Sequence, residues 1–321
     1  MLMACAAIVL GLVLLVWSAD KFVEGASGIA KNFQVPPMII GLTIVSLCTS
    51  LPEMLVALLA ALDGNNNLGI GNAIGSNIAN IGLVLGVTAL IAPLAVQSKV
   101  LKREYPVLFL IMLLAFGLMW DGELSRWDGL VLIVGLVLLI VWLLRLGLRE
   151  RDSALEAEFD DVIPKNADMK SSVLWFVVGL VVLLLSSKIV VWGAVEIATL
   201  LGVSDLVIGL TIVAIGTSLP ELVASIVSVL KNEAELAIGN VLGSNMFNIL
   251  AVLSMPALVA PNTFDAQTLV RDVPVMFVFT LVLFVVAYGF KRGGRINRVE
   301  GGLLFSGYIV YLYVLYVQSL S

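Results

Sequence analysis

Two glutamates stand out among the residues that could do chemistry, because each lies in an otherwise apolar segment and directly follows a proline. Glu53 ends the segment CTSLPE and Glu221 ends the segment GTSLPE. On a helix, side chains three and four positions apart share a face. The spacing therefore predicts that two hydroxyls can point the same way as each carboxylate, and these hydroxyls belong to Thr49, Ser50, Thr217 and Ser218.

A second polar segment follows each glutamate, GSNIAN at 75–80 and GSNMFN at 243–248. Each contains a serine and an asparagine four positions apart, so both side chains lie on one helix face. We expect these faces to form the wall opposite the glutamates, while the glycines allow close helix packing. The residues are Ser76, Asn80, Ser244 and Asn248, and the duplicated Asn77 and Asn245 could instead hydrogen-bond from helix to helix.

The prolines predict a break in each glutamate-bearing helix. Pro52 has no N–H to donate to the carbonyl of Cys48, and Pro220 has none for the carbonyl of Gly216. Each break would free main-chain oxygens beside a carboxylate. At membrane depth, non-helical backbone is tolerated only where it lines a cavity or is buried in protein.

The composition identifies the environment of these segments. The chain has 321 residues, of which 60% are hydrophobic and 13% are charged, whereas a soluble domain carries about 25% charged residues. A net charge of −5 without a basic stripe excludes a nucleic-acid partner, and two cysteines cannot form a disulfide framework. The chain has no histidine, so the commonest zinc ligand and general base are missing. We expect neither enzymatic activity nor a prosthetic group.

The apolar stretches predict an all-α polytopic membrane protein with ten transmembrane helices, since about twenty apolar residues cross a bilayer. A first five-helix repeat occupies residues 1–148, a polar cytoplasmic linker residues 149–171, and a second five-helix repeat residues 172–321. The predicted helices span residues 4–30, 38–62, 68–92, 105–120, 129–148, 172–199, 205–230, 236–259, 273–290 and 300–319.

The two halves repeat each other at an offset of 168 residues. Residues 41–85 and 209–253 align without a gap and share 22 identities in 45 positions. Because each half has five helices, an odd number, the second half enters the membrane from the opposite side. Inverted-topology repeats are typical of secondary transporters, whose binding site lies near the bilayer midplane where the repeats meet.

The distribution of lysine and arginine predicts the orientation in the membrane. With both termini outside, 14 of the 18 basic residues face the cytoplasm and two face outside, while Lys21 and Lys188 lie within helices. We therefore expect a multi-pass protein of the plasma membrane, which is the inner membrane in a Gram-negative bacterium. The lipid bilayer is then its surroundings, and no protein partner is implied.

A carboxylate at the bilayer centre costs on the order of 3 kcal/mol, so both glutamates need a compensating partner. Lys21 and Lys188 could supply structural ion pairs, but a bound cation fits better. The candidate ligands are all oxygens, which hard cations such as Ca²⁺ and Na⁺ prefer. Two carboxylates balance one Ca²⁺ or two Na⁺, so the ions should occupy the site in turn, as an antiporter requires.

These residues and motifs resemble the two α-repeats of the sodium/calcium exchanger family, within the cation/Ca²⁺ antiporter superfamily, and specifically its prokaryotic type without a regulatory domain. The resemblance implies that the first and sixth helices slide as a gating bundle to alternate access. It also implies four clustered cation sites built from Glu53, Glu221, Thr49, Thr217, Ser50, Ser218, Ser76, Ser244, Asn80 and Asn248, completed by the carbonyls of Ser46 and Ala214.

The chain departs from this pattern at Asn80 and Asn248, because many relatives carry an aspartate at one of these two positions and potassium-dependent members use an acidic residue there. We therefore expect no potassium requirement. The linker at 149–171 is also too short for the cytosolic Ca²⁺-sensing domains of animal relatives.

The sequence thus predicts an antiporter that exchanges Na⁺ for Ca²⁺ by alternating access. A Ca²⁺/H⁺ exchanger of the same superfamily is the nearest alternative, since buried carboxylates can take up protons. A passive cation channel is a more distant one, because channels usually arrange subunits around a pore axis.

Overall fold

The computed structural model describes residues 1–96, 98–157, 168–202, 214–288 and 294–319, and most of these residues are helical. The first half of the chain contains α1 (Leu2–Phe33), α2 (Pro37–Ile40), η1 (Gly41–Val45), α3 (Ser46–Thr49), α4 (Leu51–Leu62), α5 (Asn66–Ala79), η2 (Asn80–Leu85), α6 (Gly86–Ile91), α7 (Ser98–Leu118) and α8 (Arg126–Ala157), where η denotes a π-helical turn. The second half contains α9 (Met169–Leu200), α11 (Ala214–Thr217), α12 (Leu219–Leu230), α13 (Ala234–Phe247), η4 (Asn248–Val252), α14 (Ser254–Val259), η5 (Thr268–Asp272), α15 (Val273–Tyr288) and α16 (Arg298–Ser319).

Eight helical stretches in the described part of the chain are long and apolar enough to cross a membrane, which makes this a multi-pass membrane protein. The predicted spans at 105–120 and 205–230 are not among them. Basic residues crowd the start of α7, and α12 has only 12 residues, with part of 205–230 outside the described ranges. The count of ten therefore stays a prediction.

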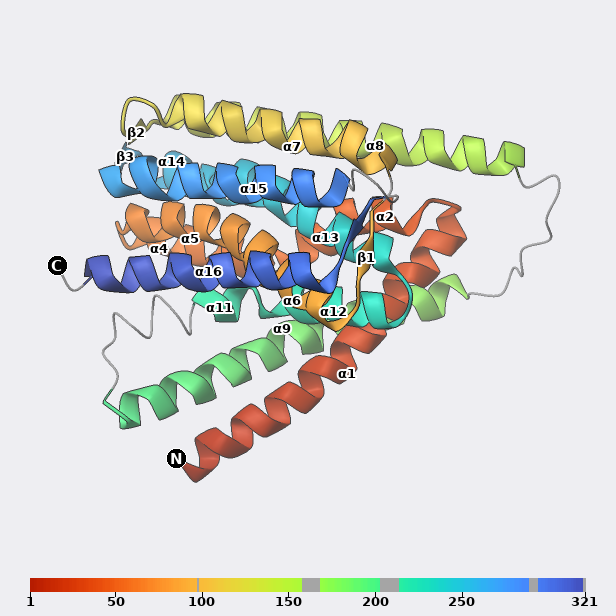
Figure 1. The fold of residues 1–321 in the computed structure, drawn as a ribbon, viewed down its shortest axis with the longest axis horizontal. Helices are drawn as coiled ribbons and strands as arrows, with labels where there is room; N and C mark the ends of the chain where they lie inside the picture. Colours follow the sequence, from red (N-terminus) through yellow and green to blue (C-terminus); the bar gives the residue numbers. More distant parts are fainter. Residues whose placement is uncertain (97, 158–167, 203–213, 289–293, 320–321) are drawn as a thin grey trace.

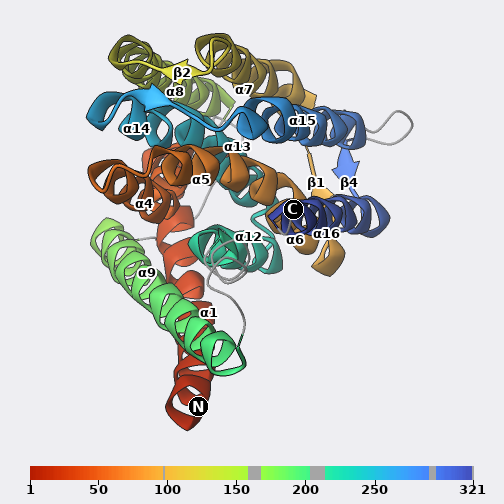
Figure 2. The same cartoon turned by 90° about the vertical axis from the view of Figure 1, so that its left-hand side faces the viewer.

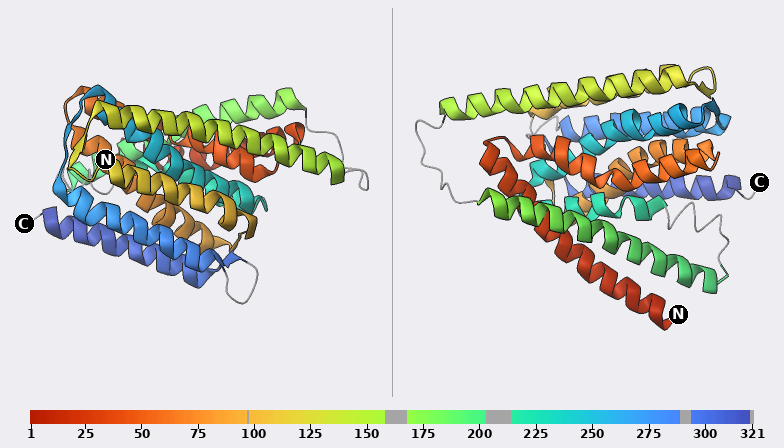
Figure 3. Two further views of the ribbon diagram at one scale, coloured as in Figure 1. Left: turned by 90° about the horizontal axis from the view of Figure 1, so that it is seen from above. Right: turned by 180° about the vertical axis from the view of Figure 1, so that it is seen from behind.

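The helices run roughly along the long axis of the molecule, and short strands join loops at its two ends (Figures 1 and 3). At one end β1 (Leu94–Ala95) pairs with β4 (Arg295–Ile296), and at the other β2 (Glu123–Leu124) pairs with β3 (Asn262–Thr263). Both chain termini lie at the β2–β3 end (Figure 1). Helix α8 continues through residue 157, into the segment predicted as linker.

Helices α1 and α9 form a pair on one side of the molecule (Figure 2). Glycines bring their backbones together, because a Cβ at Gly25 would collide with the backbone of Phe176 and one at Gly179 with the backbone of Phe22. The rings of these phenylalanines contact each other with centroids 4.8 Å apart and planes tilted by 31°. This is the close packing that small residues permit between helices in a membrane.

The centre of the molecule holds the duplicated segments, with α13 packed against α2, η1 and α3. A Cβ at Gly41 would lie 2.6 Å from the carbonyl oxygen of Leu236, and one at Gly239 would lie 2.5 Å from that of Met38. Duplicated glycines thus seat the first half of the chain directly on the second. The polar segments face each other across this contact.

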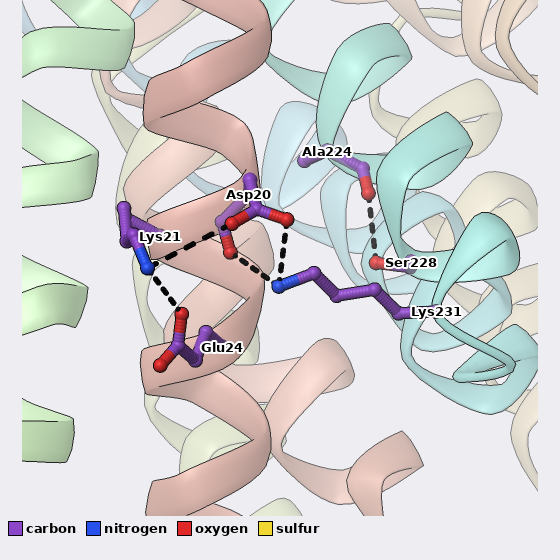
Figure 4. A network of polar contacts seen from close by, with 6 residues as sticks. All are labelled: Asp20, Lys21, Glu24, Ala224, Ser228 and Lys231. Carbon is purple, nitrogen blue, oxygen red and sulfur yellow. Dashed lines mark hydrogen bonds and ion pairs between the residues drawn. The ribbon is translucent and has the colours of Figure 1, made fainter.

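An ion pair links the α1–α9 pair to the end of α12 (Figure 4). The Lys231 ammonium lies 2.8 Å from the Asp20 carboxylate and donates to the Asp20 carbonyl at 3.0 Å. Beside it on α1, Lys21 pairs with Glu24 at 2.7 Å. These groups are partly exposed, so the pair is a surface contact between α1 and the end of α12.

Candidate functional site

The two glutamates are buried together. Glu53 and Glu221 are each 1% exposed, and their carboxylates are close enough to interact electrostatically. Neither is tied to a lysine by an ion pair among the described residues: Lys21 pairs with Asp20 and Glu24 on its own helix, and Lys188 is exposed. Because the two negative groups share a site without a positive side chain, a bound cation can balance their charge.

Each carboxylate faces hydroxyls of the opposite half. The Glu53 carboxylate interacts with the Thr217 hydroxyl, while the Glu221 carboxylate interacts with that of Thr49 and lies near that of Ser50. Thr49, Ser50 and Ser218 are fully buried. The site is therefore built across the interface of the halves.

A break precedes each glutamate, as the prolines predict. Ser50 has φ −81° and ψ 2° between α3 and α4, and Ser218 has φ −89° and ψ 5° between α11 and α12. Pro52 and Pro220 lie in the first turns of α4 and α12, where a missing N–H costs no helical bond. Glu53 and Glu221 occupy the same first turns, so the positive ends of the helix dipoles stabilise the ionised carboxylates.

The main-chain oxygens near these breaks are partly engaged. The Ser46 carbonyl accepts from the Ser50 N–H at 3.0 Å and from the Thr49 hydroxyl at 3.3 Å. The Gly216 carbonyl accepts from the Ser187 hydroxyl of α9 at 3.1 Å. Ala214 is the first residue of α11. A cation would have to share the Ser46 carbonyl with these donors.

The opposite wall comes from α5 and α13. Ser76, Ser244, Asn80 and Asn248 are all buried. The Ser244 hydroxyl lies 3.4 Å from that of Thr49, which joins this wall to the glutamate-bearing segment. Asn80 and Asn248 each begin a π-helical turn, η2 and η4. Such turns are rare and frequent at functional sites.

Six side-chain oxygens at this site are buried and make no hydrogen bond of ordinary length and angle within the described structure. Buried polar atoms are normally hydrogen-bonded, so a matched set of orphaned oxygens points to a missing ligand. They come in pairs related by the sequence repeat, and they belong to Ser50 and Ser218, Glu53 and Glu221, and Asn80 and Asn248. This set of oxygens suits a hard cation.

Sequence reasoning missed Asn240 and Asn72, and it did not name the ligand that Asn245 holds. Thr49 donates to the Oδ1 of Asn240 at 3.0 Å, and Asn80 donates from its Nδ2 to the Oδ1 of Asn245 at 3.0 Å. In the first half, Asn72 donates to the Glu53 carbonyl at 3.1 Å. The duplicated dipeptide Gly-Asn at 71–72 and 239–240 was the available signal for two of them.

Of the two asparagines expected to link helices, the structure confirms one. Asn245 of α13 accepts from Asn80 of η2, whereas Asn77 donates to the Ala73 carbonyl of its own helix at 2.8 Å. The repeat in sequence is therefore not matched by a repeat in hydrogen bonding.

Comparisons with known proteins show which family the chain matches. The family described as "Sodium/calcium exchanger protein" matches residues 3–145 and 171–317. The chain is 47% identical to the "Putative antiporter CaxA" of Alkalimonas amylolytica over 98% of this chain and 99% of that one. It is 40% identical to the "Inner membrane protein YrbG" of Escherichia coli over 99% and 98% of the two chains.

A third relative and a solved structure carry more specific names. The "Sodium/calcium exchanger MaX1" of Methanosarcina acetivorans is 31% identical over 96% of this chain and 97% of that one. A structure of the sodium-calcium exchanger NCX_Mj, soaked without Na⁺ and Ca²⁺, superposes with a TM-score of 0.83 at 32% identity. That match covers 98% of this chain and 99% of the solved chain.

Proposed function

This chain belongs to the sodium/calcium exchanger family, and from that premise we propose that it is a secondary antiporter that exchanges Na⁺ for Ca²⁺ by alternating access. One observation carries the proposal: the two interacting carboxylates and the matched residues Ser50, Ser218, Asn80 and Asn248 each keep a buried side-chain oxygen without a hydrogen bond, in pairs related by the repeat. The proposed ligands are Glu53, Glu221, Thr49, Thr217, Ser50, Ser218, Ser76, Ser244, Asn80 and Asn248, with the carbonyls of Ser46 and Ala214.

The charges of the site support exchange. One Ca²⁺ or two Na⁺ balance the charges of Glu53 and Glu221, so either ion displaces the other. An empty site holds two uncompensated carboxylates in a buried position, which should oppose the change between inward and outward access. Transport of one ion then requires return with the other. If more than two Na⁺ exchange for one Ca²⁺, the membrane potential contributes about 2.3 kcal/mol per charge per 100 mV.

We further infer ten spans arranged as two inverted five-helix repeats, with both termini outside the cell. The family match to two separate segments of similar length supports two repeats. Helix α1 starts near the end of the molecule where α16 finishes, and α9 runs in the opposite direction to α1 (Figures 1 and 3). Basic residues concentrate in the segments at the β1–β4 end, which we assign to the cytoplasm.

Uptake of Ca²⁺ into vesicles that contain the purified protein tests the function. An outward Na⁺ gradient should drive Ca²⁺ uptake, and the same vesicles without a gradient should show little. An outward H⁺ gradient should drive none. Ca²⁺ uptake driven by H⁺ alone would replace this proposal with a Ca²⁺/H⁺ exchanger, the alternative suggested by the unpartnered carboxylate oxygens.

Two further outcomes would reject the proposal. Ca²⁺ flux that continues without any counter-ion and does not saturate would indicate a channel. Absence of Ca²⁺ flux in vesicles that contain correctly inserted protein would show that the protein is not a Ca²⁺ antiporter. Glu221→Gln, which keeps the shape of the side chain and removes its charge, is the matched control for leakage.

A further inference from the structure

We propose that Asn240 and Asn245 are positioning residues that turn two ligands of the first half, Thr49 and Asn80, with their oxygens toward the cation. This inference rests on the proposed function and adds two residues to its site. Both residues lie on α13 in the second half. Both are 1% exposed, and neither belongs to the predicted ligand set.

The need for such residues follows from the chemistry of the ligands. A side-chain amide has an oxygen at one corner and an NH₂ group at the other, and only the oxygen can bind a cation. A threonine hydroxyl must likewise direct its hydrogen away from the ion and present its lone pairs. A buried group with no partner for its hydrogens would turn those hydrogens toward the carboxylates.

Asn245 supplies the acceptor for Asn80. The Asn80 Nδ2 donates to the Asn245 Oδ1 at 3.0 Å, which leaves the Asn80 Oδ1 without a hydrogen bond. The orientation of the amide is therefore fixed by a bond that crosses from the first half to the second. The same bond anchors the first residue of the π-helical turn η2.

Asn240 supplies the acceptor for Thr49. The Thr49 hydroxyl donates to the Asn240 Oδ1 at 3.0 Å, a shorter contact than its 3.3 Å approach to the Ser46 carbonyl. The Asn240 Nδ2 in turn donates to the Ser225 hydroxyl at 3.4 Å. Asn240 therefore competes with the Glu221 carboxylate for the single Thr49 hydrogen, and when that hydrogen is directed to Asn240 the Thr49 lone pairs are available to a cation.

The first half provides the internal comparison. Asn77 stands at the position that matches Asn245 in the repeat and is equally buried, but it donates to its own helix. Groups that orient metal ligands typically change metal affinity or activity by about 10- to 100-fold when mutated. We expect that range for Asn245→Leu, measured as the Ca²⁺ concentration giving half-maximal Na⁺-driven uptake, and no rise for Asn77→Leu.

A double-mutant cycle separates positioning from packing. In Asn80→Asp both side-chain oxygens can bind a cation, so there is no amide left to orient. Asn245→Leu should then raise the half-saturating Ca²⁺ concentration in the Asn80 protein but hardly change it in the Asn80→Asp background. Equal shifts in the two backgrounds would show that Asn245 acts only through packing and would overturn the inference.

A second test addresses the orientation of the Thr49 hydroxyl. Asn240→Leu removes the acceptor and should raise the half-saturating Ca²⁺ concentration, whereas Asn240→Asp keeps an acceptor oxygen and should not. A rise with Asn240→Asp would contradict the positioning of Thr49. If Asn245→Leu fails to insert, Asn245→Ala removes the same oxygen without added bulk.

The wild-type protein separates this inference from the proposed function. Wild-type vesicles that take up no Ca²⁺ would defeat the function itself and the inference with it. Normal wild-type uptake together with equal effects of Asn245→Leu and Asn77→Leu would defeat the inference alone.

Discussion

The buried helices α5 and α13 and the peripheral pair α1–α9 use similar residues for different purposes. In an apolar window of 18 residues within 234–259 every residue is buried, and in the corresponding window of 66–91 78% are, against 28% in that of α1 and 33% in that of α9. Glycines bring backbones together in both regions. In the buried region the side-chain oxygens of Asn80 and Asn248 make no hydrogen bond. In α1 and α9 the hydroxyls of Ser18, Ser172 and Ser186 donate to nearby carbonyls, and that of Ser27 is the exception among the described buried serines of the pair.

This difference indicates that the two regions have different roles. Close packing at glycines holds the α1–α9 pair together, so the pair can act as one body. The α5–α13 region keeps polar oxygens unsatisfied, which costs stability unless a ligand binds. Changes in the first region should therefore affect folding, and changes in the second should affect ion transport.

The largest effect on transport is expected from substitution of the two carboxylates. Glu53→Gln and Glu221→Gln each remove one of the two charges that balance the cation, so Na⁺-driven Ca²⁺ uptake should fall to background. Because the glutamine amide can hydrogen-bond to nearby hydroxyls, the variants should insert and melt at or above the wild-type temperature. Uptake in vesicles and melting in detergent provide the two measurements. Normal Ca²⁺ uptake by either variant would contradict the transport role assigned to the buried region.

The next effect concerns the close approach of α1 and α9. In Gly25→Ala the added methyl would collide with the backbone of Phe176, and such overpacking typically costs about 1–3 kcal/mol. We expect a lower melting temperature with unchanged Ca²⁺ affinity in the folded fraction. Gly117→Ala is the control, since a methyl there meets no other atom within 4 Å. Equal stability of the two variants would contradict a tightly packed pair.

A smaller effect is expected where the two regions touch. Ser187 of α9 donates to the Gly216 carbonyl beside the site at 3.1 Å, while the adjacent Ser186 donates to Leu183 within its own helix at 3.0 Å. Ser187→Ala should lose about 0.5–1.5 kcal/mol of stability. It should also alter the turnover rate, whereas Ser186→Ala should change stability without altering turnover. Identical turnover in both variants would show that this contact does not couple the regions.

The smallest effect should come from the Asp20–Lys231 ion pair of Figure 4. Its side chains are 43% and 30% exposed, and exposed pairs typically contribute about 0.2–1 kcal/mol. A double-mutant cycle with Asp20→Asn and Lys231→Met should give a coupling energy in that range, reduced further at high salt. A much larger coupling would mean that the pair locks α1–α9 to α12.

Most of the fold follows from the sequence because long apolar runs form helices whatever surrounds them. The helix predicted at 236–259 extends over 234–259 as α13, η4 and α14, and that at 172–199 over 169–200 as α9. The π-helical turns could not be predicted, since α- and π-helical turns share one apolar pattern. The extension of α8 to Ala157 was also missed, because charged residues mark the membrane boundary and not the helix end.

The parts of the candidate site that could be predicted are those whose sequence motifs occur in both halves of the chain. The duplicated motifs identified buried oxygens that the structure brings to one place, such as Glu53, Glu221 and Thr49. Asn240 was not identified as the acceptor for Thr49, nor Asn245 as the acceptor for the Asn80 amide, because a hydrogen bond between distant segments depends on how the halves dock. The sequence repeat also hides the different bonding of Asn77 and Asn245.

Each carboxylate faces hydroxyls of the opposite half, and this arrangement has a consequence for how the chain evolved. A polypeptide with only one such half would carry a single glutamate and would lack the hydroxyls that face it. If the halves are inverted as proposed, such a polypeptide could complete the site by pairing with a second, antiparallel copy, and insertion in both directions requires few orienting lysines and arginines. Fusion of two genes would then have allowed each copy to acquire its own charge bias and its own asparagine contacts.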